Sequence, residues 1–529
     1  MKKHKKTEKN IIIGAGPGGL IHGLLLKKAR PDDEVIIYEA IDKPGGFCTT
    51  FEKAVTYKKE KLFYKINIPL ITSQFSEGES FDQLLDYLGV ENIRWKHVKK
   101  IFKYYPLDSD PFIFSTTGPN DVINLCCDIK EKNALTKHFK TQKKLINDLL
   151  FNFTMHPNFW QKLKILFTMP GSALMAASDK TYKTYLDQLG IKTPLVREII
   201  DLAEAFMGTD VDKVSAVAEM GMIESFLSSK AVQPCNGDDF ITLPENMERR
   251  FLQLGGKVIY KTKINEIVFS GNKAIGIKTG SETILADNII LAVEQDAIPP
   301  LLQKGKHIKK IEKLLQKANA LSLPNSDYYA YYLIDKKAIE ERPDLKEIGY
   351  HIYKLPDGLI KDNWRLPIWV PDQLINDKYY YLGMVLIEHD QEKIDWWIDL
   401  RNTNYAQYKQ EKEKLAAEYE KALIQVEPLF QKYPLLKPLL VFSPASYLPY
   451  GSKYPISGYA QTPQNIGVNR MHPILLENLT ISGSASFSGG VFGAIVGAWV
   501  AFYMSFRKKY DIQIGNKKAM FSTDIKNLP

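Results

Sequence analysis

A glycine-rich turn near the N-terminus constrains the fold more than any other feature of the chain. Residues Asn10–Ile13 have the composition of a buried parallel strand, and an apolar helix is expected from about Gly18 to Ala29. The GxGxxG turn between them comprises Gly14, Ala15, Gly16, Pro17, Gly18 and Gly19. Its glycines permit a tight bend, close approach of a pyrophosphate, and close helix–strand packing. Free N–H groups at the helix start bind phosphate, so the turn predicts a dinucleotide-binding βαβ unit.

An acidic residue after the second strand supports this interpretation. The strand Glu34–Tyr38 ends at Glu39, where a carboxylate accepts hydrogen bonds from the hydroxyl groups of an adenosine ribose. The lysine-rich start and the apolar run after it resemble a signal peptide. The glycine spacing favours a folded segment instead.

The residues after the second strand indicate which dinucleotide is bound. The run Glu39–Thr50, EAIDKPGGFCTT, contains a second glycine pair, and Lys43 could offset phosphate charge. This run resembles the second signature of the amine oxidase and phytoene desaturase superfamily of flavoproteins. The resemblance implies FAD, bound here by Ala40, Lys43, Gly45, Gly46 and Phe47. Phe47 stands where the family often has arginine, so a charge contact to FAD is missing from the pattern.

A distant segment resembles the returning half of the same domain. Within Asp238–Val293, the pattern predicts a helix over Leu243–Leu254 and strands at Lys257–Tyr260, Ile264–Phe269 and Ala274–Lys278. The segment closes on the strand Ile289–Ala292. In relatives, the backbone near the position of Ile264 holds the edge of the adenine.

A third motif lies near the C-terminus, in Asn478–Ala494, where a strand, a glycine turn and a helix recur. By resemblance, Gly483 and Ser484 approach the pyrophosphate or ribityl chain, and Gly490, Val491 and Phe492 lie beside the flavin. Many relatives have an acidic residue where Ser484 stands. The apolar stretch Val491–Phe506 is shorter than the roughly 20 residues of a membrane span, so we expect no transmembrane helix here.

The subgroup with the greatest resemblance comprises phytoene desaturases, carotenoid isomerases and retinol saturases, which Val441–Ser482 resembles in its Ser-Pro element and last strand. The expected fold is α/β, with a Rossmann-type FAD-binding domain of the GR2-like kind interleaved with an α+β substrate-binding domain. The FAD domain is expected at 1–60, 237–300 and 443–510, and the substrate domain at 61–236 and 301–442. A basic tail follows at 511–529.

The resemblance implies an FAD-dependent oxidoreductase that acts on C–C bonds of an isoprenoid or polyene lipid by hydride transfer with flavin N5. No catalytic triad or Walker loop is apparent, and His351, His389 and His472 are the candidate proton donors. A flavin amine oxidase is the alternative, with an aromatic cage from Tyr447 and either Tyr450 or Tyr454. A non-catalytic FAD-containing lipid carrier is a third reading. The direction of the reaction, the electron partner and the oligomeric state stay open.

Charge and cysteine usage bear on partners. The net charge is +9, but five lysines in the first ten residues and the basic tail supply most of it, which argues against a nucleic-acid groove. Basic ends and the aromatic, lysine-containing stretches Leu149–Ala176 and Trp95–Tyr105 fit a peripheral membrane contact, though core elements with solvated lysines fit equally. The four cysteines show no metal spacing and suggest a reducing compartment. We therefore expect a cytoplasmic protein that binds no metal, and the family resemblance implies a hydrophobic small-molecule substrate.

Overall fold

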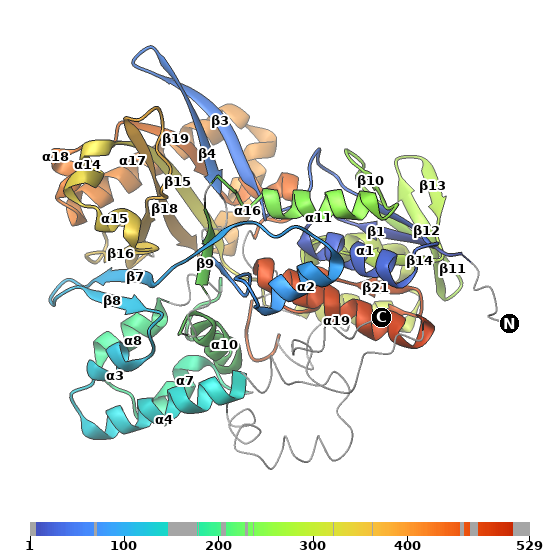
Figure 1. Ribbon diagram of the computed structural model, residues 1–529, viewed down its shortest axis with the longest axis horizontal. Helices are drawn as coiled ribbons and strands as arrows, with labels where there is room; N and C mark the ends of the chain where they lie inside the picture. The colour runs from blue at the N-terminus through green and yellow to red at the C-terminus, as the bar shows by residue number, and fades with distance from the viewer. Residues whose placement is uncertain are drawn as a thin grey trace.

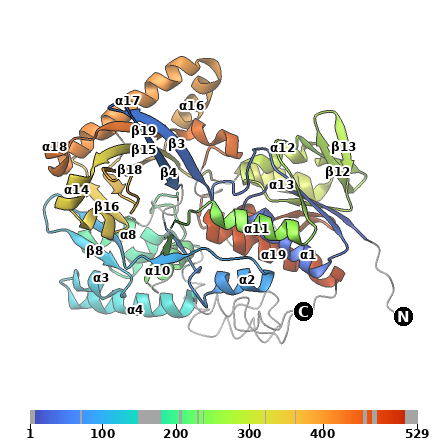
Figure 2. The ribbon, with the colours of Figure 1, turned by 45° about the horizontal axis from the view of Figure 1, so that its top comes forward.

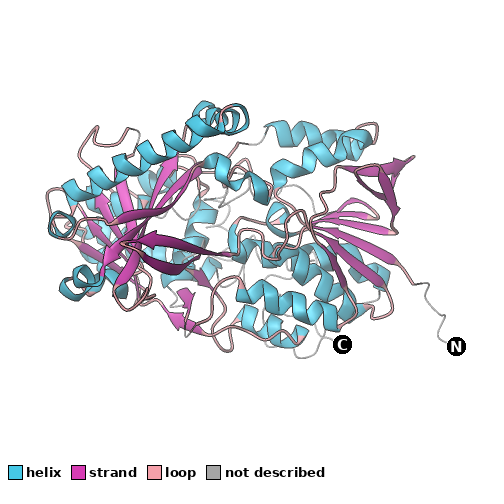
Figure 3. Cartoon of the chain, turned by 90° about the horizontal axis from the view of Figure 1, so that it is seen from above, coloured by secondary structure: helices cyan, strands magenta, loops and turns pink. Residues whose placement is uncertain are grey.

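The computed structural model is built around two large sheets that lie toward opposite ends of the molecule (Figure 1, Figure 3). It describes residues 7–67, 71–146, 177, 179–202, 208–227, 231–235, 237–320, 322–361, 363–454, 460–465 and 474–510. The N-terminal segment and the last helix both belong to the same end of the molecule.

The first sheet has six strands in the order β10-β2-β1-β14-β21-β20. Its strands are β1 (Lys9–Ile13), β2 (Glu34–Tyr38), β10 (Lys257–Ile259), β14 (Asn288–Leu291), β20 (Ile474–Leu476) and β21 (Leu479–Ile481). All neighbours are parallel except β20, which runs antiparallel to β21. The β-branched side chains of β1 are buried because helices and a small sheet cover its two faces.

Helices cover one face of this sheet, namely α1 (Pro17–Ala29), α2 (Ser80–Leu88), α11 (Thr242–Gln253) and α19 (Gly490–Tyr510). The other face carries the strands β11 (Glu266–Ser270), β12 (Lys273–Thr279) and β13 (Glu282–Leu285) with the helices α12 (Ile298–Leu302) and α13 (Lys309–Ala320). The predicted strand at Ile264 begins two residues later, because the chain turns at Lys261 with φ of 53° and rejoins a ladder only at Glu266. The layers make this an α/β arrangement, as predicted.

The second sheet has seven strands in the order β19-β15-β18-β17-β16-β7-β8. They are β7 (Lys100–Tyr105), β8 (Phe112–Ser115), β15 (Ser326–Asp335), β16 (Tyr350–Lys354), β17 (Arg365–Trp369), β18 (Tyr379–Glu388) and β19 (Lys437–Phe442). Most neighbours are antiparallel, and β16 pairs with β7 in parallel. Each strand therefore presents alternate residues to the two faces of the sheet.

Helices cover the outer face of the seven-stranded sheet: α14 (Lys336–Glu341), α15 (Asp344–Glu347), α16 (Gln391–Thr403), α17 (Tyr405–Val426) and α18 (Leu429–Lys432). The charged stretch Lys409–Lys421 is part of α17, which begins after Asn404 because the side chain of Asn404 accepts a hydrogen bond from the N–H of Gln407. The inner face is covered by the hairpin β3 (Thr50–Tyr57) and β4 (Glu60–Asn67).

A group of helices lies beside β7 and β8 (Figure 2). It comprises α3 (Asn120–Asn124), α4 (Ile129–Ile146), α7 (Tyr182–Gln188), α8 (Pro194–Asp201) and α10 (Ala216–Leu227). A small sheet of β5 (Thr72–Ser73), β9 (Ala231–Pro234) and β6 (Trp95–His97) lies nearby.

Two of the stretches that suggested membrane contact have different outcomes. Trp95–Tyr105 forms β6 and β7, in which Phe102 and Tyr104 are buried in the core and Trp95 and Tyr105 are half-buried. Of Leu149–Ala176, all residues lie outside the described ranges. Among the helices that are described, none has both the length and the apolar character needed to cross a membrane.

Candidate functional site

The carboxyl ends of three neighbouring parallel strands carry the sequence-predicted motifs. The Gly14–Gly19 turn follows β1, Glu294 follows β14, and Gly483 follows β21 within the short helix η6 (Gly483–Ser486). In doubly wound sheets the ligand lies in the crevice outside these strand ends. The topology therefore brings segments nearly five hundred residues apart to one edge of the sheet.

Close backbone approaches explain several of the predicted glycines. A Cβ on Gly19 would lie 2.0 Å from the carbonyl oxygen of Gly14, and a Cβ on Gly18 would lie 2.6 Å from the Cα of Gly483. Gly14 itself has φ of 104°, and a Cβ there would lie 2.3 Å from the oxygen of Ala292. Any side chain at these positions would separate α1 from the strands, so these glycines are needed to assemble the edge.

Gly16 is different, because its surroundings are open. A Cβ on Gly16 would meet no atom within 4 Å, and Gly16 has an ordinary φ of −69°. Gly46, with φ of 54°, faces it, and a Cβ there would lie 3.7 Å from the Cα of Gly16. The fold alone does not require glycine at position 16, whereas a phosphate lying against this backbone would. The residues present therefore fit a dinucleotide.

Glu39 ties this turn to the end of β2. Its Oε2 accepts a hydrogen bond from the N–H of Ala15 at 2.7 Å, and its Oε1 accepts one from the N–H of Ile41 at 3.0 Å. The side chain is half-buried, and a carboxylate has about four acceptor positions, so each oxygen retains capacity for a ligand hydroxyl.

The second signature lies partly against the turn. Gly45 donates its N–H to the oxygen of Ala15 at 2.9 Å, which fixes the glycine pair beside the first motif. Ala40 is exposed beyond it. The Lys43 ammonium donates to the carbonyl oxygen of Thr50 at 3.2 Å, so in this conformation it serves the start of β3.

The remaining predicted contacts are distributed around the edge. Ile264 has a buried side chain, and no hydrogen bond between described residues involves its backbone, which leaves that backbone available to an adenine edge. Gly490 begins α19 in an exposed position. Behind it, Val491 and Phe492 lean into the helical layer, where the Phe492 ring lies 5.3 Å from that of Phe81.

An aromatic face begins where the second signature ends. Phe47 contacts Tyr447 at 6.2 Å and Tyr450 at 5.6 Å between ring centroids. These rings continue into the inner face of the seven-stranded sheet. We call this surface the aromatic face; it comprises Tyr329, Tyr331, Tyr350, Trp369, Tyr381, Phe442 and Tyr447. Sequence reasoning missed its strand residues, although the tyrosine-rich runs YYAYY and YYY were a usable signal.

Trp369 is the centre of the aromatic face. Its indole makes edge contacts with the rings of Tyr331 at 5.8 Å and Tyr350 at 5.8 Å. The neighbouring strand provides room for it at Gly383, where a Cβ would lie 2.4 Å from the indole.

We therefore expect Gly383→Ala to displace the indole and to lower the free energy of unfolding by about 1–3 kcal/mol, the usual cost of overpacking. Chemical denaturation with near-ultraviolet circular dichroism would measure both effects. In the double variant with Trp369→Phe, the smaller ring should recover part of the loss. Equal losses in both backgrounds would contradict this account.

Two polar groups on the same side of β15 lack partners among the described residues. The Asp327 side chain is 1% exposed with Oδ2 unpaired, and the buried hydroxyl of Tyr331 is unpaired as well. Asp327, Tyr329 and Tyr331 alternate along the strand and so share one face. Burial raises the pKa of Asp327 to about 8, against the opposing effect of His389. The carboxyl group is therefore protonated at neutral pH, and it can donate a hydrogen bond.

The raised pKa of Asp327 predicts a pH dependence of stability. In the unfolded chain the carboxyl titrates near its usual pKa of about 3.9, so unfolding releases a proton between about pH 4 and pH 8. Stability of the wild type should fall across this window, by a few kcal/mol in total. Asp327→Asn should remove the fall, and exposed Asp357→Asn should retain it. Urea denaturation at several pH values would compare them; parallel curves for wild type and Asp327→Asn would refute the prediction.

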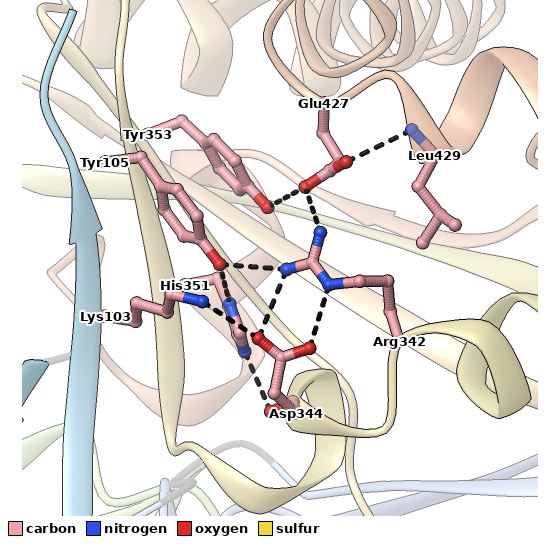
Figure 4. Close-up of polar contacts among 8 residues, drawn as sticks. All are labelled: Lys103, Tyr105, Arg342, Asp344, His351, Tyr353, Glu427 and Leu429. Atoms are coloured by element: carbon pink, nitrogen blue, oxygen red, sulfur yellow. Dashed lines mark hydrogen bonds and ion pairs between the residues drawn. The ribbon is translucent and has the colours of Figure 1, made fainter. Parts of the chain in front are cut away.

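The histidines predicted as proton donors have other partners. His351 lies on β16 between Tyr350 and Ile352, so it points to the opposite sheet face from Tyr350. There its Nδ1 pairs with the Tyr105 hydroxyl at 2.9 Å, in a network with Arg342 (Figure 4). Burial lowers the pKa of His351 to about 4. The His351 side chain therefore lies on the opposite side of the sheet from the aromatic face.

The other two candidate proton donors are His389 and His472. The Nδ1 of His389 lies 2.8 Å from Oδ1 of Asp210, and its charge acts on buried Asp327. His389 is therefore held by Asp210, near enough to Asp327 to act on that carboxyl group electrostatically. His472 lies outside the described residues.

The tyrosines considered for an amine cage are mostly in the core. Tyr447 is buried, stacks on Phe442 at 5.7 Å, and donates its hydroxyl to the carbonyl oxygen of Asp327 at 3.2 Å. Tyr454 is buried and donates to Gln391 at 2.6 Å. Tyr450 alone of these three is half-buried, beside Phe47. A cage made of two of these tyrosines is not present in this conformation.

Comparison with known proteins gives structural matches only. No protein-family model matches the chain, and no curated protein matches its sequence. A variant of putrescine oxidase has a TM-score of 0.59 and 14% identity, over 96% of this chain and 99% of that one. An oxidoreductase from Methanosarcina mazei has a TM-score of 0.57 and 15% identity, over 93% of this chain and 98% of that one. Cyclohexylamine oxidase from Brevibacterium oxydans has a TM-score of 0.57 and 14% identity, over 96% of this chain and 99% of that one. At such identities the likeness defines the fold, which this chain shares over nearly its whole length with these oxidoreductases.

Proposed function

We propose that the chain is an FAD-dependent oxidoreductase whose substrate lies against the aromatic face. The observation that carries the proposal is the open backbone of Gly16, opposite Gly46 and beside Glu39, at the carboxyl edge of a parallel sheet. Nothing in the fold requires glycine there, while a bound pyrophosphate does. The names of the structural neighbours, which are oxidases and an oxidoreductase, agree with this reading.

In this proposal the first sheet and its helices bind FAD, and the second sheet binds the substrate. The predicted segments 1–60, 237–300 and 443–510 would hold FAD, and 61–236 and 301–442 the substrate, with three corrections to these bounds: α2 and α13 pack on the first sheet, and β3 pairs with β4 against the second. FAD would supply the redox chemistry, leaving binding and orientation to the protein. Most rings of the aromatic face are buried beneath the hairpin β3–β4, so the substrate would lie against its half-buried rings, Tyr329 and Tyr350, and against Phe47, which joins the two parts.

For the substrate we propose an isoprenoid or polyene lipid with reaction at C–C bonds. The aromatic face consists of large rings, most of them tyrosines, and their apolar bodies suit a long hydrocarbon. Burial favours the protonated form of Asp327, and that form has no negative charge to attract a cation. A flavin amine oxidase is the second candidate, because two of the structural neighbours are amine oxidases by name and aromatic rings also bind ammonium groups.

The first test is the visible spectrum of the purified protein, before and after incubation with FAD. Flavin absorbance is the expected result, and a protein that takes up no FAD would overturn the proposal. The loaded protein is then mixed anaerobically with polyenes, retinoids, putrescine or cyclohexylamine. Bleaching by polyenes or retinoids supports the lipid substrate, and bleaching by amines alone supports the second candidate. Stable binding of a polyene with no bleaching by any compound would indicate a carrier.

A further inference from the structure

The loop that follows β14 places a carboxylate at the centre of the candidate cofactor site. Glu294 comes three residues after Leu291, the last residue of β14, and β14 lies between β1 and β21. In the same loop, the carbonyl oxygen of Ala292 lies so close to the glycine turn that a Cβ added to Gly14 would be only 2.3 Å from it. The loop therefore lies against the glycine turn itself.

Glu294 is deep in the protein and still accessible from one side. Its side chain is only half-buried by surface area, yet burial raises its pKa to about 7, with the negative charge of Asp296 adding to the effect. Its carboxylate lies beside the Ser484 hydroxyl, at the neighbouring ends of β14 and β21.

The carboxylate is short of hydrogen-bond donors. The hydroxyl of Ser484 lies 3.3 Å from both of its oxygens, and no other hydrogen bond to it is found among the described residues. A carboxylate has about four acceptor positions, and a buried carboxylate whose positions lack donors raises the free energy of the folded protein. The next residue, Gln295, is 4% exposed, and its Nε2 has no partner in the described part of the chain. This loop therefore carries polar atoms that a ligand would satisfy.

Ser484 stands at the position where the superfamily often has an acidic residue. The structure brings the Glu294 carboxylate to within hydrogen-bond distance of that serine from the neighbouring strand. The negative charge absent from position 484 is thus present at nearly the same place. Hydroxyl groups are the donors that a single carboxylate in a dinucleotide crevice can bind.

We propose that Glu294 and Ser484 form a hydroxyl-binding pair, in which the Glu294 carboxylate accepts hydrogen bonds from the ribose or ribityl hydroxyls of the bound dinucleotide. The proposal rests on the proposed function, because it assumes that FAD occupies this edge. Ser484 orients the carboxylate through one hydroxyl, and the remaining acceptor positions bind the ligand.

The test measures FAD affinity and stability of the same variants. Glu294→Gln keeps the shape and removes the charge, and we expect it to weaken FAD binding about 10- to 100-fold at about pH 8. Ser484→Ala should weaken binding less. Glu282→Gln is the matched control, because Glu282 is exposed on β13, and the affinity of this variant should stay close to wild type. Fluorescence titration of the apoprotein gives the dissociation constants.

A structural role would give a different pattern. Because burial raises the pKa of Glu294, ionisation of this group destabilises the apoprotein as pH rises from about 4.5 to about 7. Glu294→Gln should therefore be more stable than wild type above about pH 7, while binding FAD more weakly. Wild-type affinity should fall as pH drops below about 7, and the affinity of Glu294→Gln should change little. Loss of stability together with affinity would overturn the proposal.

Two fragments identify the hydroxyls. ADP-ribose carries the ribose hydroxyls of the adenosine half, and riboflavin carries the ribityl chain. Weaker binding of either fragment by Glu294→Gln supports the proposal and assigns the contact to that half. Equal binding of FAD by wild type and Glu294→Gln would overturn it. A wild-type protein that takes up no FAD would instead overturn the proposed function.

Discussion

Replacing Gly16 with valine is expected to weaken FAD binding about 10- to 100-fold and to leave the protein folded. The fold tolerates a side chain at Gly16, since a Cβ would meet no atom within 4 Å and φ is −69° with ψ of 173°. This extended conformation is the one that residues before proline prefer, and valine adopts it readily. A valine would occupy the space of the pyrophosphate, at an overpacking cost of about 1–3 kcal/mol. Fluorescence titration with FAD and thermal unfolding of the apoprotein measure the two effects.

The matched control is Gly19→Ala, three residues away in the same turn. A Cβ there would lie 2.0 Å from the oxygen of Gly14, so this smaller substitution should destabilise the apoprotein. The two variants thus separate a glycine needed by the ligand from a glycine needed by the fold. If Gly16→Val bound FAD as tightly as the wild type does, no phosphate would lie against this turn.

Arg342→Met is expected to lower the free energy of unfolding by about 3 kcal/mol, the largest loss that we expect from a single side chain outside the glycine turns. Arg342 donates to Asp344 at 2.8 Å, to Glu427 at 3.1 Å and to the Tyr105 hydroxyl at 3.0 Å (Figure 4). Glu427 is 5% exposed and also accepts from Tyr353 at 2.6 Å. Methionine would leave this buried carboxylate without its cation, which costs more than the pair itself contributes.

The exposed pair Lys336–Glu340, 3.5 Å apart on α14, provides the control. Lys336→Met should cost less than about 0.5 kcal/mol, because solvent screens an exposed pair. In the double variant Arg342→Met with Glu427→Gln, part of the loss should return, because the unpaired charge is gone. Arg342→Lys should not restore full stability, since an ammonium cannot make the planar fork of contacts. Urea denaturation would measure all four, and a loss below about 1 kcal/mol in Arg342→Met would contradict the role of the network.

The local elements were predictable because their signals are local. The strand before Gly14, the helix after it and the strand ending at Tyr38 form within a residue or so of their predicted bounds. Hydrophobic period and glycine spacing act over a few residues, and neither depends on the rest of the chain.

The substrate side was less predictable, because it depends on which face of a strand each residue takes. His351 and Tyr350 are neighbours in sequence, and the sheet directs them to opposite faces. Trp369 meets Tyr331 only because β17 and β15 both pair with β18, and Gly383 leaves room for the indole. None of these relations follows from spacing along the chain.

The sequence by itself determined the dinucleotide-type βαβ unit and the glycines that surround its ligand edge, since steric demands on a tight turn select glycine at fixed intervals. The tertiary structure alone decided that Glu294 lies beside Ser484 and that an aromatic face follows Phe47. These contacts join strands hundreds of residues apart, and their register is set by pairing and burial across the whole sheet.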